Sequence, residues 1–266
     1  MRYALSPLAF AFGAIIGSFL NVCIVRLPEQ ESVISPASHC PACKTVIQFY
    51  DNIPLISYLY LQGRCRFCGT AISPRYFFVE LLTAVLAVAL LRRFGIGPGF
   101  LVNFVFVAAL IVITFVDLNV RIVPDAISLP GIGLGLLSSI VGAQLLSGPL
   151  FMLPSPMSSL LGILVGGGSL LLVAWAYQLF TGREGMGGGD IKLLAMIGAF
   201  WGWPSVPVTL FFASLTGSFV GLALMLKQGV DGKYPLPFAP FLCLGALFHL
   251  FFGDSLIASY LPPWVE

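Results

Sequence analysis

Apolar segments long enough to cross a membrane recur along this chain of 266 residues. About 20 apolar residues in a helix span the hydrocarbon core of a bilayer. Charged residues make up only 9% of the chain and 58% of it is hydrophobic, which excludes an ordinary soluble domain. The sequence therefore predicts an all-α polytopic membrane protein with about eight transmembrane helices. The predicted spans are residues 4–25, 77–95, 99–117, 126–147, 158–180, 189–204, 206–226 and 236–256.

Two of these segments need comment. The first is expected to be a permanent helix and not a secretory signal, because only Arg2 provides a basic start and no Ala-x-Ala-like cleavage site follows. The segment 189–204 gives the weakest signal, since Asp190 and Lys192 stand at its beginning. We expect that segment to be short, tilted or partly interfacial.

Basic residues favour one orientation of the predicted helices. With the N-terminus outside, ten Lys and Arg residues fall in inside loops, and only Arg2, Arg92 and Arg93 fall outside. Loops rich in Lys and Arg stay on the cytoplasmic side. The net charge of +2 is too small to suggest binding to nucleic acid. The inside set is Arg26, Lys44, Arg64, Arg66, Arg75, Arg121, Arg183, Lys192, Lys227 and Lys233.

Residues 27–76, the cysteine module, form the one stretch that looks like a small domain outside the membrane. The module contains two C-x-x-C pairs, Cys40 with Cys43 and Cys65 with Cys68, separated by 21 residues. Each pair can present two thiolates, and four thiolates close a tetrahedral structural zinc site. Because the cytosol keeps thiols reduced, a metal site is favoured over two disulfides or free thiols, which remain the alternative.

The remaining candidate ligands have simpler interpretations. His39 could replace one thiolate, but four cysteines make this unnecessary. Cys23 and Cys243 lie in apolar segments, so we expect both to be buried packing residues.

Two aspartates stand at the ends of apolar segments, where an ionisable residue is costly and suggests a function. Asp117 follows one apolar run, and Asp190 follows Gly187, Gly188 and Gly189. Two carboxyl groups can share the work of peptide hydrolysis, since one accepts a proton from water while the other polarises the scissile carbonyl. Glycines would let an extended peptide approach Asp190 closely. The pattern predicts an aspartyl protease at the cytoplasmic membrane face.

Structural explanations for these and neighbouring carboxylates stay open. Asp125 could be an N-cap or first-turn acid of a helix, with a supporting role near the two aspartates. Asp190 could cap a helix and pair with Lys192. Glu80, early in the second apolar segment, could have a function or could pair with Arg75 or Arg64.

Two other functions compete with proteolysis. A non-catalytic membrane assembly factor would dock a cytoplasmic partner on the cysteine module and use its aspartates only to cap helices. A small transporter would use Asp117 and Asp190 as a proton or cation relay. A relay favours carboxylates near mid-span, whereas these two lie at segment ends, which weighs against transport.

Ordered motifs along nearly the whole chain resemble those of the type IV prepilin peptidases, the bifunctional leader peptidases and N-methyltransferases of type IV pili and type II secretion. The stretch between Pro28 and Cys40 is shorter than in some members of that family. No glycine-rich Rossmann fingerprint accompanies the motifs, so the methyl-donor site is not located. The motifs are residues 17–22, 26–28, the two cysteine pairs, 52–59, 75–81, 117–125 and 184–193.

The resemblance implies that Asp117 and Asp190 are the catalytic aspartates of a GxGD-type protease in a bacterial inner membrane. It implies cleavage of prepilins or pseudopilins after a glycine at the cytoplasmic face. The new N-terminal residue, usually phenylalanine, would then be N-methylated with S-adenosylmethionine. Residues expected to support the peptidase site are Gly187, Gly188, Gly189, Asp125 and Lys192.

The same resemblance links the cysteine module to methyl transfer and implies three parts of the chain. Residues 1–26 form the first transmembrane helix, 27–76 the cytoplasmic zinc-ribbon-like module with its four cysteines, and 77–266 the transmembrane peptidase domain. The implied cofactors are structural zinc and S-adenosylmethionine. The particular pilins and the oligomeric state are not indicated by the sequence.

Overall fold

The regular secondary structure of the chain is helical. The computed structural model describes residues 4–145, 153–182, 186–228 and 236–260, and this part contains no strand beyond two isolated bridges. Each of the eight apolar segments corresponds to a helix, so the all-α prediction is confirmed. Arg2, Arg183 and Lys233, which entered the count of basic residues, lie outside the described residues. The long helices are α1 (Ser6–Arg26), α3 (Arg75–Phe94), α4 (Pro98–Val120), α5 (Asp125–Leu145), α6 (Pro156–Thr181), α7 (Gly188–Trp201), α8 (Ser205–Gln228) and α9 (Ala239–Tyr260).

Among the described residues, five helices are long and apolar enough to cross a membrane: α1, α4, α5, α6 and α8. Part of α9, residues 239–253, is a shorter apolar helix. Helix α3 has Arg92 and Arg93 in its last turn. Helix α7 has only 14 residues, about 21 Å at the usual rise per residue, in line with the expected short segment. The number of eight spans therefore stays a prediction.

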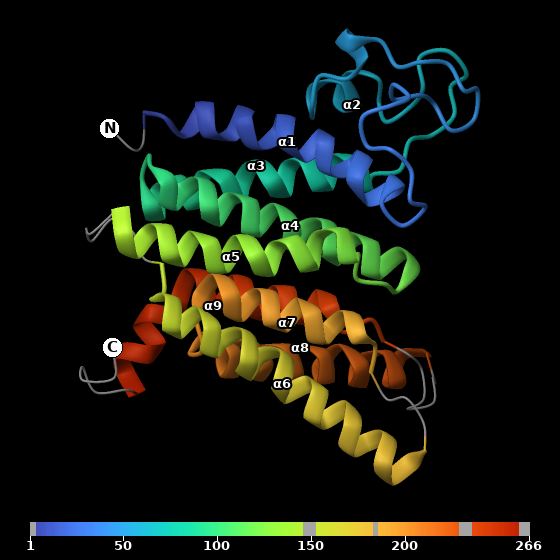
Figure 1. Ribbon diagram of the computed structural model, residues 1–266. Helices are drawn as coiled ribbons and strands as arrows, with labels where there is room; N and C mark the ends of the chain where they lie inside the picture. The colour runs from blue at the N-terminus through green and yellow to red at the C-terminus, as the bar shows by residue number, and fades with distance from the viewer. Residues whose placement is uncertain (1–3, 146–152, 183–185, 229–235, 261–266) are drawn as a thin grey trace. The chain divides into compact units, whose positions relative to one another are not determined.

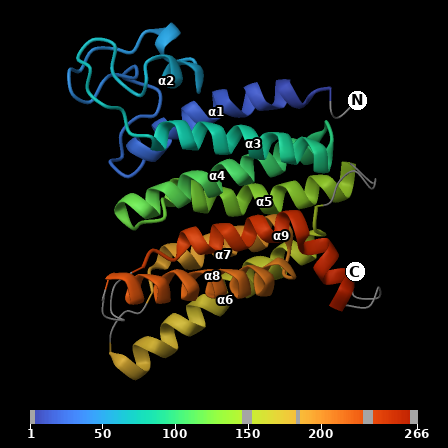
Figure 2. The same cartoon turned by 180° about the vertical axis from the view of Figure 1, so that it is seen from behind.

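The chain divides into two compact units, residues 1–112 and 113–266, with the boundary inside α4. In the first unit α1 runs along α3, as both views show (Figures 1 and 2). Glycines allow this approach, because a Cβ on Gly13 would lie 2.7 Å from the Cα of Ala84. The ring of Phe12 on α1 packs against Phe104 on α4, with ring centroids 5.0 Å apart.

The short helix α7 is the centre of the second unit. It contacts α5, α6, α8 and α9 (Figure 1), and all of its residues from Leu193 to Trp201 are buried. Its closest neighbour is α6, because Gly162 and Gly198 face each other and a Cβ on either would overlap the backbone carbonyl of the other. The hydroxyl of Ser159 also donates to the carbonyl of Ala199 at 2.7 Å. Small residues and this hydrogen bond hold the two helices in contact.

The contact between α6 and α7 predicts different effects for two alanine substitutions in α6. Gly162→Ala should lower the free energy of unfolding by about 1–3 kcal/mol, because the added methyl group overlaps α7. Gly168→Ala is the matched control, since nothing lies within 4 Å of a Cβ there and alanine favours a helix. Thermal unfolding of the detergent-solubilised variants measures both effects. Equal melting temperatures for the two variants would contradict the close contact.

Candidate active site and metal site

Asp117 lies near the end of α4 and is almost fully buried, with 5% of its surface exposed. The backbone N–H of Ala239, the first residue of α9, donates a hydrogen bond to its carboxyl group. That N–H has no partner within its own helix, because the first N–H groups of a helix never do. The oxygen Oδ2 of Asp117 is buried without a hydrogen-bond partner among the described residues. A buried carboxylate oxygen without a hydrogen-bond partner is unusual in a structure, and a catalytic role is one of the explanations for it.

Asp190 stands in the first turn of α7 and is partly buried. Its carboxyl group interacts electrostatically with that of Asp117, so the two lie close together within the second unit. The end of α4 and the beginning of α7 thus bring together two side chains that are far apart in the sequence. This is the arrangement that the sequence predicted for the two aspartates.

The three glycines before Asp190 differ in their surroundings. A Cβ on Gly189 would lie 2.8 Å from the Cβ of Val123, in the loop between α4 and α5. Gly189 is therefore required for the close approach of that loop to α7. Nothing lies within 4 Å of a Cβ on Gly187 or Gly188, so these two leave open space beside the carboxyl groups.

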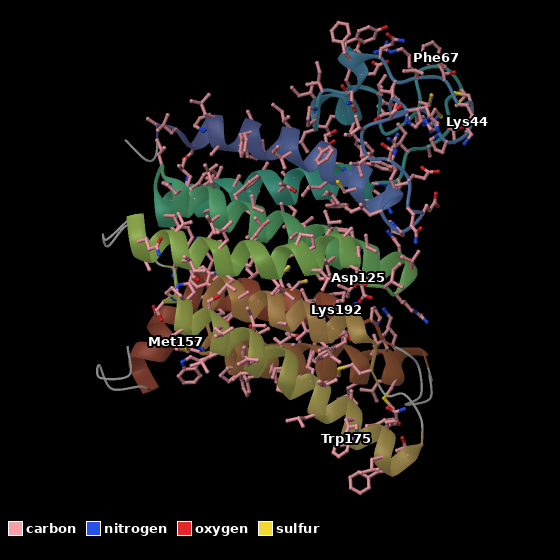
Figure 3. The ribbon with its side chains drawn as sticks, viewed as in Figure 1. Lys44, Phe67, Asp125, Met157, Trp175 and Lys192 are labelled. Carbon is pink, nitrogen blue, oxygen red and sulfur yellow. The ribbon has the colours of Figure 1, made fainter. Side chains whose placement is uncertain are left out.

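Asp125 and Lys192 form an ion pair between α5 and α7. The Nζ of Lys192 donates to both carboxylate oxygens of Asp125, at 2.7 and 2.8 Å, and Figure 3 labels the two residues close to each other. The structural alternative in which Lys192 pairs with Asp190 is not observed, because residues two apart on a helix do not face each other. Asp125 is the first residue of α5, so its expected place in a first turn is confirmed.

The sequence did not reveal the contribution of α9 to this site. Cys243 is buried, as predicted, and its thiol is hydrogen-bonded with the side chain of Thr114 on α4 and interacts electrostatically with both carboxyl groups. Cys243 and Ala239, both of α9, therefore lie beside the aspartates. Prolines at 237 and 240 bracket the start of α9 and are a signal for a helix beginning there. Nothing in that signal indicates the contact with Asp117.

The four cysteines of the module converge on one point. Their sulfur atoms all lie within 4.8 Å of one another, and Cys40 to Cys68 and Cys43 to Cys65 are 3.8 and 4.0 Å apart. Sulfur atoms around a tetrahedral zinc ion with bonds of about 2.3 Å lie about 3.8 Å apart. The cluster can therefore hold a metal ion, and its four-sulfur donor set fits zinc. His39 instead makes a 3.2 Å contact through Nδ1 with the carbonyl of Ala37.

Both cysteine pairs are built in the same way. In each, the backbone N–H of the first cysteine donates to a threonine carbonyl five residues later, at 2.9 Å, so a tight loop is closed. Each loop needs a positive φ after its second cysteine, which is 58° at Lys44 and 70° at Gly69. Isolated β-bridges flank the loops, His39 with Val46 and Arg64 with Ala71. The equivalence of the two loops explains why four sulfur atoms meet symmetrically.

A threonine two residues after each cysteine pair is hydrogen-bonded with the second cysteine of that pair. A hydrogen bond with the Thr70 side chain lowers the pKa of Cys68 to about 6, and the corresponding bond with Thr45 lowers the pKa of Cys43. A metal binds the thiolate form of cysteine, so the hydrogen bonds of both threonines favour the form of these two residues that binds a metal.

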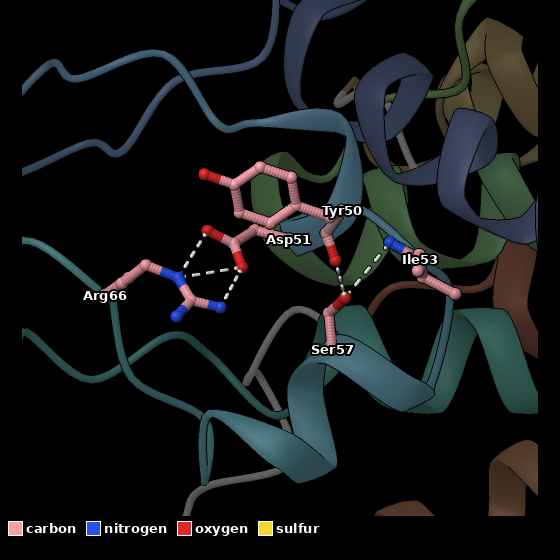
Figure 4. Close-up of polar contacts among 5 residues, drawn as sticks. All are labelled: Tyr50, Asp51, Ile53, Ser57 and Arg66. Atoms are coloured by element: carbon pink, nitrogen blue, oxygen red, sulfur yellow. Dashed lines mark hydrogen bonds and ion pairs between the residues drawn. The ribbon is translucent and has the colours of Figure 1, made fainter.

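An ion pair joins the second cysteine pair to the segment between the two pairs. The Nε of Arg66 donates to both carboxylate oxygens of Asp51, at 3.0 and 2.8 Å (Figure 4), and the hydrogen bond with Arg66 lowers the pKa of Asp51. Asp51 ends the short helix η1 (Phe49–Asp51). Arg66 lies between the ligands Cys65 and Cys68, so η1 is fixed beside the metal site.

Comparison with known proteins identifies the family. Residues 11–94 match the model of the bacterial peptidase A24 N-terminal domain, and residues 104–222 match that of the type IV leader peptidase family. This chain belongs to the type IV leader peptidase family. The leader peptidase model covers Asp117 and Asp190, whereas the N-terminal domain model covers the four cysteines.

Relatives match this leader peptidase family member over most of its length. A protein of Aeromonas hydrophila named prepilin leader peptidase/N-methyltransferase is 38% identical, with 96% of this chain and 93% of the relative covered. Proteins of the same name from Xanthomonas campestris and Pseudomonas aeruginosa are 35% and 34% identical, with 96% of this chain and 94% of each relative covered. No solved structure matches the chain significantly.

Proposed function

We propose that this chain cleaves the leader peptide from type IV prepilins or pseudopilins and then N-methylates the new N-terminus. The observation that carries the peptidase part is the meeting of Asp117 and Asp190, one of them with a bare buried oxygen, in a member of the leader peptidase family. The relatives that match 96% of the chain carry both activities in their name. We therefore expect the carboxyl groups of Asp117 and Asp190 to act on the scissile peptide bond of the substrate.

The two carboxyl groups divide the hydrolysis between them. The N–H of Ala239 and the start of α9 stabilise negative charge on Asp117, so Asp117 accepts a proton from the attacking water. The two carboxyl groups hold one proton between them, and this proton is on Asp190. Asp190 uses it to donate a hydrogen bond to the scissile carbonyl oxygen. Asp117 then returns its proton to the leaving nitrogen. The open space at Gly187 and Gly188 leaves room for the extended backbone of the substrate.

The peptidase assignment predicts the loss of cleavage in Asp117→Asn and Asp190→Asn. Each amide removes one proton-transfer group, so the rate should fall at least about a hundredfold. Mass spectrometry of a prepilin-like substrate incubated with each variant measures the cleavage and its position. Glu29→Gln is the control, because Glu29 is an exposed carboxylate in the turn after α1 and the same change there removes a charge away from the two aspartates. A non-catalytic assembly factor would tolerate all three changes, and cleavage by the Asp117 or Asp190 variant would refute this assignment.

The cysteine module binds structural zinc and serves the methyl transfer in this proposal. Four thiolates leave no open position on the metal, so the metal orders the module and does not take part in catalysis. S-adenosylmethionine, when bound, supplies the electrophilic methyl group. The support for this division is that the four cysteines lie in a segment separate from the aspartates, matched by a separate domain model.

Loss of one thiolate should separate the two activities. Cys40→Ser and Cys68→Ser should each abolish stoichiometric zinc binding, since the site then lacks one of its four ligands. Methylation should fall at least about tenfold, while cleavage should change less. Elemental analysis gives the zinc content, and mass spectrometry of the product with and without S-adenosylmethionine gives both activities. Cys23→Ala is the control outside the cluster. Equal loss of both activities would instead make the module a support of the whole fold.

The proposal places the N-terminus outside the bacterial inner membrane, with the cysteine module and both aspartates facing the cytoplasm. The uneven distribution of basic residues supports this orientation. Gly97→Cys, between α3 and α4, should react with a membrane-impermeant maleimide in intact cells. Glu31→Cys, exposed in the module, should react only after permeabilisation. The reverse labelling pattern would reject the orientation.

A further inference from the structure

Leu55 stands at the centre of a strained turn in the cysteine module. Its φ and ψ are 62° and −48°, and the N–H of Ile56 donates to the carbonyl of Pro54 across it at 2.7 Å. This is a γ-turn with positive φ, a rare conformation that a leucine adopts only where its surroundings impose it. Strained backbone of this kind concentrates at functional sites. The Leu55 turn (Pro54 to Ile56) therefore requires an explanation.

The Leu55 turn is fixed by Glu80 of α3. The N–H of Leu55 donates to Oε2 of Glu80 at 2.7 Å, and the side chain of Ser18 on α1 is also hydrogen-bonded with Glu80. Only 8% of Glu80 is exposed. Its partners are thus a backbone N–H and a hydroxyl, and not the arginine that was one alternative from the sequence. One buried carboxylate joins α1, α3 and the module.

Glu80 lies where α1 and α3 of the first unit are closely packed. A Cβ on Gly17 of α1 would lie 2.7 Å from the Cα of Glu80, so the two helices are in direct backbone contact at this level. About one turn away, the side-chain amide of Asn21 donates to the carbonyl of Tyr76 at 3.0 Å. These contacts fix α1 and α3 against each other and leave the carboxylate little freedom.

A continuous set of contacts leads from the Leu55 turn to the metal site. Ser57, in the short helix α2 (Ile56–Tyr60), accepts the N–H of Ile53 at 3.1 Å and donates to the carbonyl of Tyr50 at 3.0 Å (Figure 4). The residue after Tyr50, Asp51, is paired with Arg66 between two of the cysteine ligands. The segment from Tyr50 to Ser57 is therefore held at one end by Glu80 and at the other by the metal-binding loop.

We propose that Glu80 is a positioning residue for methyl transfer, which fixes the cysteine module on α1 and α3 through the Leu55 turn. This inference rests on the proposed role of the module in methylation. Transfer of a methyl group requires donor and amine to be aligned closely, and small displacements reduce the rate strongly. A module of about 50 residues has little core of its own, so its position depends on such contacts.

Glu80→Met tests the inference because methionine is of similar size and accepts no strong hydrogen bond from Leu55. The kcat for methylation should fall about 10- to 100-fold, in the range for loss of a hydrogen bond to a charged group. The kcat and KM for leader cleavage should change less than about twofold, and the zinc content should not change. In hydrogen–deuterium exchange, the amide of Leu55 should lose its protection.

A second substitution, at Leu55, distinguishes a positioning role of Glu80 from a general loss of structure in the module. Leu55→Gly adopts positive φ without strain, so it should restore part of the methylation in the Glu80→Met background. Leu59→Gly is the matched control, because Leu59 is an exposed residue of α2 that should give no rescue. Glu80→Gln, which keeps an acceptor oxygen, should retain more activity than Glu80→Met.

Several results would overturn the inference. These are wild-type methylation by Glu80→Met, an equal loss of cleavage, unchanged exchange at Leu55, or equal rescue by both glycine substitutions. The cysteine variants test the proposed function independently. If Cys40→Ser loses methylation selectively while Glu80→Met does not, only the role of Glu80 is refuted. If Cys40→Ser affects both activities equally, the role of the module itself is refuted.

Discussion

The close approach of Gly189 to Val123 is the contact on which the candidate active site depends. Val123 lies in the loop that leaves α4 just after Asp117 and enters α5 at Asp125. Gly189 lies beside Asp190 at the start of α7. Because no side chain separates the loop from the helix, the two carboxyl groups come within electrostatic range and Lys192 reaches Asp125. A side chain at position 189 would move the loop and disturb both pairs together.

The contacts of α7 explain how so short a helix can be central. Its buried residues pack between neighbours, and the facing glycines of α6 and α7 let two backbones touch. Helix ends near a bilayer require partners for their free N–H groups, because lipid offers none. At the start of α9 that partner is Asp117. The same aspartate that accepts from the first N–H of a neighbouring helix also has one buried oxygen without a hydrogen-bond partner in the described part of the chain.

The features predicted correctly from the sequence are those with local patterns. Long apolar runs gave the helices, and the spacing of two C-x-x-C pairs gave a cluster of four sulfur atoms. The partners of Lys192 and Glu80 were not predictable, because they depend on how helices pack and not on neighbours in sequence. The Leu55 turn had no signal either, since leucine is not a residue that favours positive φ. The approach of the two aspartates followed from the motifs, although their catalytic roles remain a proposal.

The same interaction occurs in both units: a carboxylate near a helix end accepts a hydrogen bond from a backbone N–H at the start of another helix. Asp117 accepts from Ala239, and Glu80 accepts from Leu55. A carboxylate suits these places because it only accepts, whereas an amide would add donors that need partners of their own. The two carboxylates differ in their remaining hydrogen-bond partners. Glu80 has a second partner in Ser18, so its hydrogen bonding serves the fold. Asp117 has one oxygen without a hydrogen-bond partner among the described residues and a second carboxyl group beside it, and this difference supports the catalytic role proposed for Asp117.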